Sequence, residues 1–214
     1  MTTDPAAIVE TRFIHQIHRQ ATTLLARAAG APTAPIGALA ELRDFLVAAL
    51  HHHHETEDDL LWPSITAADP SAGAGLADLS GEHDLLDAAL DDLAIAPLRG
   101  DADRPGLAIA AEAVRGLVHR HLDHEEPILF PALRAHMPDE AWTAFSRTVI
   151  ASAPPDGAHL MIGFMDRVGT PADLDLVTAN LPEPVRQMLP AMRAQARVTL
   201  NSLQSAAGNS ENGR

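Results

Sequence analysis

The sequence contains an internal repeat: two stretches of histidine, acidic and apolar residues recur at an offset of 68 residues. The matching pairs are His51/His119, His53/His121, Glu57/Glu125, Asp58/Glu126, Leu61/Leu129, Trp62/Phe130 and Pro63/Pro131. The same offset relates His15 to His83. So many uncommon residues matching at one offset indicate that this part of the chain consists of two equivalent helical hairpins.

The spacing within each half predicts a metal-binding face. Each half has a single histidine followed, 38 residues later, by a His-x-x-x-Glu motif. Residues four apart lie on one face of a helix, one turn from each other. If the halves pack about a pseudo-twofold axis, four histidines surround the centre and two glutamates can bridge two cations. The candidate ligands are His15, His53, Glu57, His83, His121 and Glu125.

The rest of the sequence predicts an all-α protein. Proline and glycine clusters divide it into segments rich in alanine and leucine, and no long stretch alternates as a β-strand does. Four long helices are predicted, at about 5–29, 38–67, 76–96 and 107–136. Their short connections favour an up-down-up-down four-helix bundle.

The sequence changes character after Pro138. Shorter helices are predicted there, and we expect them to form a C-terminal helical appendage over one end of the bundle. The polar segment from Ser205 to Arg214 is predicted to be disordered. These predictions divide the chain into a bundle at 1–138, a packed helical extension at 139–204 and a tail at 205–214.

Composition excludes several functional classes. The net charge of −14 argues against binding to nucleic acid or anionic lipid. No leader-like segment or membrane-spanning apolar stretch is visible, so we expect a cytoplasmic protein with no membrane partner. Without cysteine, imidazole and carboxylate are the strong ligands that remain. They suit iron, manganese or zinc, and the paired arrangement favours two iron ions.

The motifs resemble those of the hemerythrin-like, or HHE cation-binding, proteins. The resemblance covers about residues 10–136 and rests on His15, His53-His54-x-x-Glu57-Asp58-x-x-Leu61-Trp62-Pro63, Glu82-His83 and His121-x-x-x-Glu125-Glu126-x-x-Leu129-Phe130-Pro131. It implies a four-helix bundle around a non-haem di-iron centre, bridged by two carboxylates and usually a solvent oxygen. Members are linked to oxygen binding, to oxygen or iron sensing, and to reactions with peroxide or nitric oxide.

The sequence differs from the oxygen-carrying hemerythrins at two positions. Asp87 stands where they have a second histidine on the third helix. Glu125 follows its histidine by four residues, where they have an aspartate after five. A fifth histidine ligand must then come from elsewhere, and His54 is the first candidate because some members of the wider family use that position. His18 and His124 are further candidates, and an additional open position favours peroxide or nitric oxide chemistry over oxygen carriage.

Three functional hypotheses follow. The first is a di-iron protein that reacts with peroxide, nitric oxide or O2, with possible catalase-like or detoxifying turnover. The alternative is a module that binds O2 reversibly or senses iron or redox state without turnover. In the third, the metals only stabilise the bundle. A ferritin-like oxidase is disfavoured, because it would carry Glu-x-x-His motifs.

Overall fold

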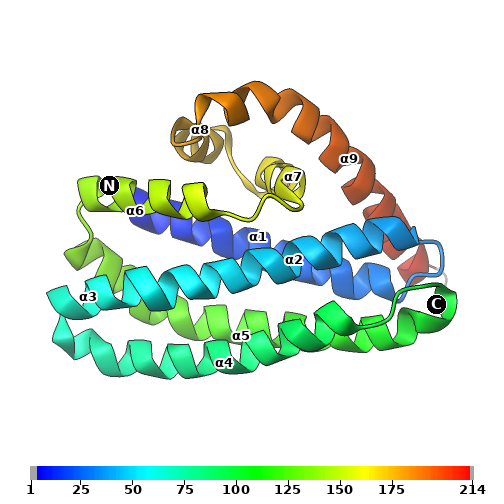
Figure 1. Ribbon diagram of the computed structural model, residues 1–214, viewed down its shortest axis with the longest axis horizontal. Helices are drawn as coiled ribbons and strands as arrows, with labels where there is room; N and C mark the ends of the chain where they lie inside the picture. Colours follow the sequence, from blue (N-terminus) through cyan, green and yellow to red (C-terminus); the bar gives the residue numbers. More distant parts are fainter. Residues whose placement is uncertain (1–3, 213–214) are drawn as a thin grey trace.

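The computed structural model describes residues 4–212, and all regular structure among them is helical (Figure 1). This confirms the prediction of an all-α protein. No helix within this range is both long and apolar enough to cross a membrane. The elements are α1 (Ala6–Ala29), α2 (Ile36–Thr56), η1 (Glu57–Leu61), α3 (Trp62–Ala68), η2 (Pro70–Ala72), α4 (Gly73–Ile95), η3 (Asp101–Asp103), α5 (Arg104–His136), α6 (Asp139–Ser152), α7 (Ala158–Val168), α8 (Pro171–Ala179) and α9 (Glu183–Asn212).

Four long helical segments lie side by side along the length of the molecule (Figure 1). They are α1, the continuous run from α2 to α3, α4 and α5. α1 packs against α2 and α5, and α4 packs against the same two helices, so each segment has two neighbours. The segments have nearly the bounds that the sequence predicts.

The second segment is interrupted by η1, a single π-helical turn that begins at Glu57. Pro63 follows this turn in the first turn of α3. Since the helix continues from η1 into α3, this proline lies inside a helix, and its missing N–H leaves one carbonyl of the preceding turn without its helical partner. The π turn begins at the glutamate of the His-x-x-x-Glu motif and separates two regular stretches of helix.

The apolar core consists of two clusters with a polar layer between them. On α4, Leu79 belongs to one cluster and Leu86 to the other. On α5, Leu129 and Leu122 are divided in the same way. His83 and Glu125 lie between these positions, so apolar side chains shield them from water on both sides.

The C-terminal helices pack on one side of the long segments (Figure 1). α7 and α9 contact each other and α1, and Phe164 and Leu200 join the larger apolar cluster with Phe45 of α2. The division into a bundle at 1–138 and an extension at 139–204 remains a prediction. α8 begins with a capping box in which the Thr170 and Asp173 side chains bond each other's backbone N–H.

The predicted disorder of the tail is wrong for its described part. α9 continues through Ser205 as far as Asn212, and residues 213–214 lie outside the described range. Ala206 and Ala207 are buried, and Ala206 belongs to the larger apolar cluster. The composition of the segment is polar, but these two small apolar side chains lie on the buried face of the helix and hold it in place.

The close approach of α7 and α9 gives a first prediction. A Cβ at Gly163 would lie 2.5 Å from the Ala196 Cβ and 2.9 Å from Leu200 Cδ1. We expect Gly163→Ala to lower the free energy of unfolding by about 1–3 kcal/mol, because the helices must move apart. Gly208→Ala is the control, since no atom lies within 4 Å of that Cβ and alanine favours the helix. Urea denaturation measures both, and a Gly163→Ala protein as stable as the control would contradict the packing.

Candidate metal centre

The structure brings the six candidate ligands together at the polar layer. They come from α1, α2 with η1, α4 and α5, and form two groups that share Glu57. Within each group the possible ligand atoms all lie within 4.8 Å of one another. The groups are His15, His53, Glu57 and Glu125, and Glu57, His83 and His121.

Glu57 contacts a histidine of each group with a different oxygen. Its Oε1 lies 3.4 Å from His53 Nε2, and its Oε2 lies 3.5 Å from His83 Nε2. The residue is only 2% exposed. This is the position that a carboxylate bridging two cations must occupy.

Glu125 holds the equivalent position on α5. Its Oε2 lies 3.5 Å from both His15 Nε2 and His121 Nε2, and the side chain is fully buried. Each glutamate therefore contacts one histidine from each group. The two halves of the repeat meet at this centre, as the equal spacings of the sequence require.

Three of the four histidines are oriented by an outer carboxylate. In each pair a carboxylate accepts the Nδ1–H, which leaves Nε2 unprotonated and directed at the centre. The pairs are His15 with Glu126 at 3.1 Å, His83 with Asp58 at 2.9 Å and His121 with Glu82 at 2.9 Å.

One consequence is an unfavourable contact between two imidazoles. The Nε2 atoms of His83 and His121 lie 3.1 Å apart. Because the outer carboxylates hold the proton of each ring on Nδ1, both of these nitrogens present a lone pair. Two facing lone pairs repel each other unless a cation lies between them.

Burial sets the charge of the centre. It raises the pKa of Glu57 well above its usual range, and the neighbouring Glu125 charge raises it further. Burial also lowers the pKa of His53 well below its usual range and that of His121 to about 4. His53 and His121 are thus neutral at pH 7, which metal ligation requires.

The outer carboxylate of Glu126 stays ionised. Burial alone would raise its pKa, but hydrogen bonds from His15 and from Arg19, at 2.6 Å, lower it to about 2. A permanent negative charge at this position favours the His15 tautomer with the proton on Nδ1. On the other side, Ser80 donates to Asp58, which in turn accepts from His83.

Several buried polar atoms of the centre have no hydrogen-bond partner. They are His15 Nε2, His53 Nε2, Glu57 Oε2 and both carboxylate oxygens of Glu125. Leaving such atoms unpaired costs roughly 1–3 kcal/mol each. His15 Nε2 is an acceptor because Glu126 holds the proton of that ring on Nδ1, and the carboxylates are acceptors once they lose their protons, so the residues fit metal cations.

Comparison with known protein families matches residues 9–134, more than half of the chain, to the hemerythrin HHE cation binding domain. The chain belongs to this hemerythrin family. Curated proteins and solved structures gave no match.

His54 lies beside the hemerythrin centre but outside both groups of ligand atoms. It is 2% exposed, and its Nδ1 lies 2.7 Å from Asp87 Oδ1. Its ring stacks on His83 at 4.4 Å between centroids. Asp87, which replaces the second histidine of the oxygen carriers, therefore orients His54 as the other outer carboxylates orient their histidines.

His18 and His124 have contrasting surroundings. His18 is buried, packs edge-on against His53 at 4.7 Å, and has no hydrogen bond to either ring nitrogen. Burial lowers its pKa well below the usual range, so the ring is neutral. His124 is half exposed and bonds Glu82 at 2.7 Å, on the outer side of the helices.

Glu82 was part of the family motif, but its hydrogen bonds to His121 and His124 were not predicted. It accepts from both His121 and His124, but its counterpart in the repeat is Ile14, so the repeat gives no signal for it. The aromatic residues of the repeat lie where the symmetry places them. Trp62 stacks on His83 and Phe130 on His15.

The raised pKa of Glu57 gives a pH prediction for the metal-free protein. A carboxyl whose pKa is raised on folding stabilises the fold below its unfolded-state pKa, and this contribution is lost as the pH rises through the folded-state pKa. Glu57→Gln keeps the neutral form at every pH. We expect its Tm to exceed that of the wild type by several degrees, with a difference that grows as the pH rises above the usual range of a glutamate.

Thermal unfolding in chelator measures this difference. Glu55→Gln is the control, since Glu55 is exposed on α2. A Glu57→Gln difference that does not change with pH would contradict the raised pKa.

Proposed function

We propose that this chain is a non-haem di-iron protein of an up-down-up-down four-helix bundle. It reacts with peroxide, nitric oxide or O2 at a centre bridged by Glu57 and Glu125, with a role in defence against oxidants. His15 and His53 bind one iron, and His83 and His121 bind the other. The observation that carries the proposal is that each glutamate contacts one histidine of each group.

The donor set supports iron. Neutral imidazoles and carboxylates suit iron, manganese and zinc, and two bridging carboxylates offset the charge of two cations held close together. Bound iron supplies a Lewis acid and an electron store for small oxidants. The residues of this chain orient the ligands, and the apolar clusters on both sides keep bulk water out.

His54 is the extra nitrogen ligand in this proposal, on the side of His83. Its support is the hydrogen bond to Asp87, which places the Nδ1 proton away from the centre. His51 and His124 also place Nδ1 near a carboxylate, but their side chains are 32% and 50% exposed, against 2% for His54. The remaining coordination positions are open to a small oxidant.

Iron stoichiometry and reactivity test the function together. We expect two irons per chain after iron-replete expression, and turnover when the diferrous protein is mixed with peroxide or nitric oxide. A stable, reversible O2 adduct without turnover would instead support the carrier or sensor alternative. Fewer than one iron per chain would contradict the proposal.

The bridging role of Glu57 has a direct test. Glu57→Ala removes the one carboxylate that both groups share, so we expect the paired centre to be lost. Glu55→Ala, at an exposed position on the same helix, should retain two irons. Iron analysis and the optical spectrum of the diferric protein measure both, and two irons in Glu57→Ala would refute the bridge.

The repeat provides matched variants for the extra ligand. The counterpart of His54 is Leu122, and that of His18 is Leu86. We expect His54→Leu to weaken iron binding at least tenfold and to shift the diferric spectrum, because a ligand is lost. His18→Leu should leave both unchanged. The reverse result would transfer the ligand role from His54 to His18.

A further inference from the structure

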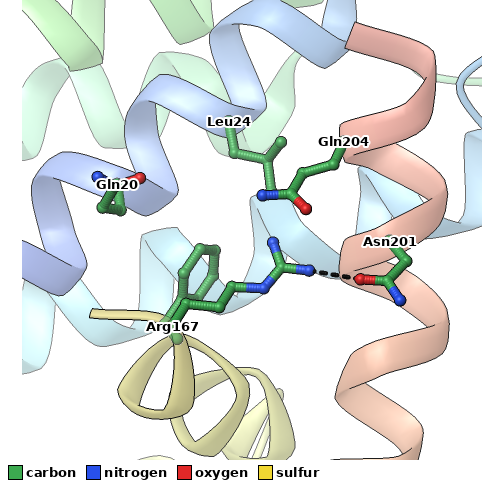
Figure 2. Close-up of a pocket in the computed structure, with 6 residues that line it drawn as sticks. Gln20, Leu24, Arg167, Asn201 and Gln204 are labelled. Atoms are coloured by element: carbon green, nitrogen blue, oxygen red, sulfur yellow. Dashed lines mark hydrogen bonds between the residues drawn. The ribbon is translucent and has the colours of Figure 1, made fainter. Parts of the chain in front are cut away.

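A second polar pocket lies away from the metal centre, between α1, α7 and α9. Its volume is about 330 Å³. It is lined by Gln20, Leu24, Phe164, Arg167, Asn201 and Gln204 (Figure 2). None of these residues belongs to the candidate metal centre, so the pocket is a separate feature of the chain.

Arg167 differs from the other buried or half-buried arginines among residues 4–209 in having no acidic partner. Every other arginine that is buried or half-buried in residues 4–209 forms an ion pair with a carboxylate; these are Arg19, Arg43, Arg104, Arg115 and Arg193. Arg167 is half-buried, and its one hydrogen bond is from Nη2 to Asn201 Oδ1 at 2.9 Å. In a chain of net charge −14, an unpaired guanidinium in a pocket is unexpected.

The guanidinium is oriented for a ligand. It points toward Asn201 and Gln204 of α9, where the hydrogen bond to Asn201 holds one edge (Figure 2). A guanidinium has five N–H donors in a planar fork, so most of them remain available. Burial lowers the pKa of Arg167 and no nearby acid offsets this effect, although the group stays charged at pH 7.

We propose that this pocket binds a small monocarboxylate anion through Arg167. The planar fork matches a carboxylate with two parallel hydrogen bonds. A single guanidinium neutralises one negative charge, whereas a phosphate dianion needs more positive charge than the pocket contains. The amides of Gln20 and Gln204 suit hydroxyl or carbonyl groups on the same ligand, and Leu24 and Phe164 provide an apolar wall.

The pocket size limits the ligand. A water molecule takes up about 30 Å³ in the liquid, so the cavity holds about ten waters. Lactate fits this volume and carries one carboxylate and one hydroxyl group. It is therefore the probe, with acetate, succinate, inorganic phosphate and chloride as comparison anions.

The experiment is isothermal titration calorimetry of the iron-loaded full chain with each anion at constant ionic strength, followed by thermal unfolding. We expect saturable, one-to-one lactate binding and weaker binding of phosphate and chloride. Because the ligand connects α1 to α7 and α9, a tenfold excess over Kd should raise the Tm by roughly 3–6 °C.

Three variants locate the binding. Arg167→Gln removes the charge, and we expect it to lose lactate binding by at least tenfold. Asn201→Asp places a carboxylate beside the guanidinium, so it should pair with Arg167 and abolish lactate binding while the chain stays folded. Arg197→Gln is the control, because Arg197 is exposed on α9, the helix of Asn201, and does not line the pocket.

The outcomes separate this proposal from the metal centre. Iron content should be unchanged in all three variants, so a failure of the di-iron proposal leaves the anion test intact. Lactate binding that survives in Arg167→Gln, absence of saturable binding up to tens of millimolar, or a preference for phosphate would each overturn the proposal.

Discussion

The burial of two like charges is the constraint on which this structure depends. Glu57 and Glu125 are both almost fully excluded from water and lie among neutral imidazoles. Two adjacent carboxylates in an apolar interior are strongly unfavourable unless protons or cations compensate them. The apolar clusters above and below the layer maintain this dehydration, so the same packing that forms the core also makes the centre selective for cations.

The outer carboxylates fix the orientation of the histidines around the two buried glutamates. Asp58 and Glu126 follow the two glutamates directly in sequence, and each reaches the histidine of a neighbouring helix, His83 or His15. One short stretch of helix therefore supplies an inward ligand and an outward hydrogen-bond acceptor. The acceptor fixes which ring nitrogen of a histidine on another helix carries the proton. The position of one helix along its neighbour therefore affects the geometry of the candidate metal centre.

The sequence predicted the part of this site that helical periodicity controls. Spacings of four residues and a repeat of 68 residues were sufficient to bring six side chains to one layer. Contacts between helices without a repeat partner were not predictable, as with Glu82, whose counterpart is Ile14. The end of α9 was missed for a similar reason, because the burial of Ala206 depends on tertiary packing and not on local composition.

α1 links the two polar sites of the chain. It contributes His15 to the metal layer and, further along, Gln20 and Leu24 to the pocket around Arg167. The two sites have opposite charges. The buried carboxylates of the first need cations to balance them, and the unpaired guanidinium of the second needs an anion. The charge of either site can be balanced without the other, because the two sites have no charged residue in common. The C-terminal helices therefore supply Arg167, Asn201 and Gln204 to the pocket and none of the candidate ligands of the metal layer.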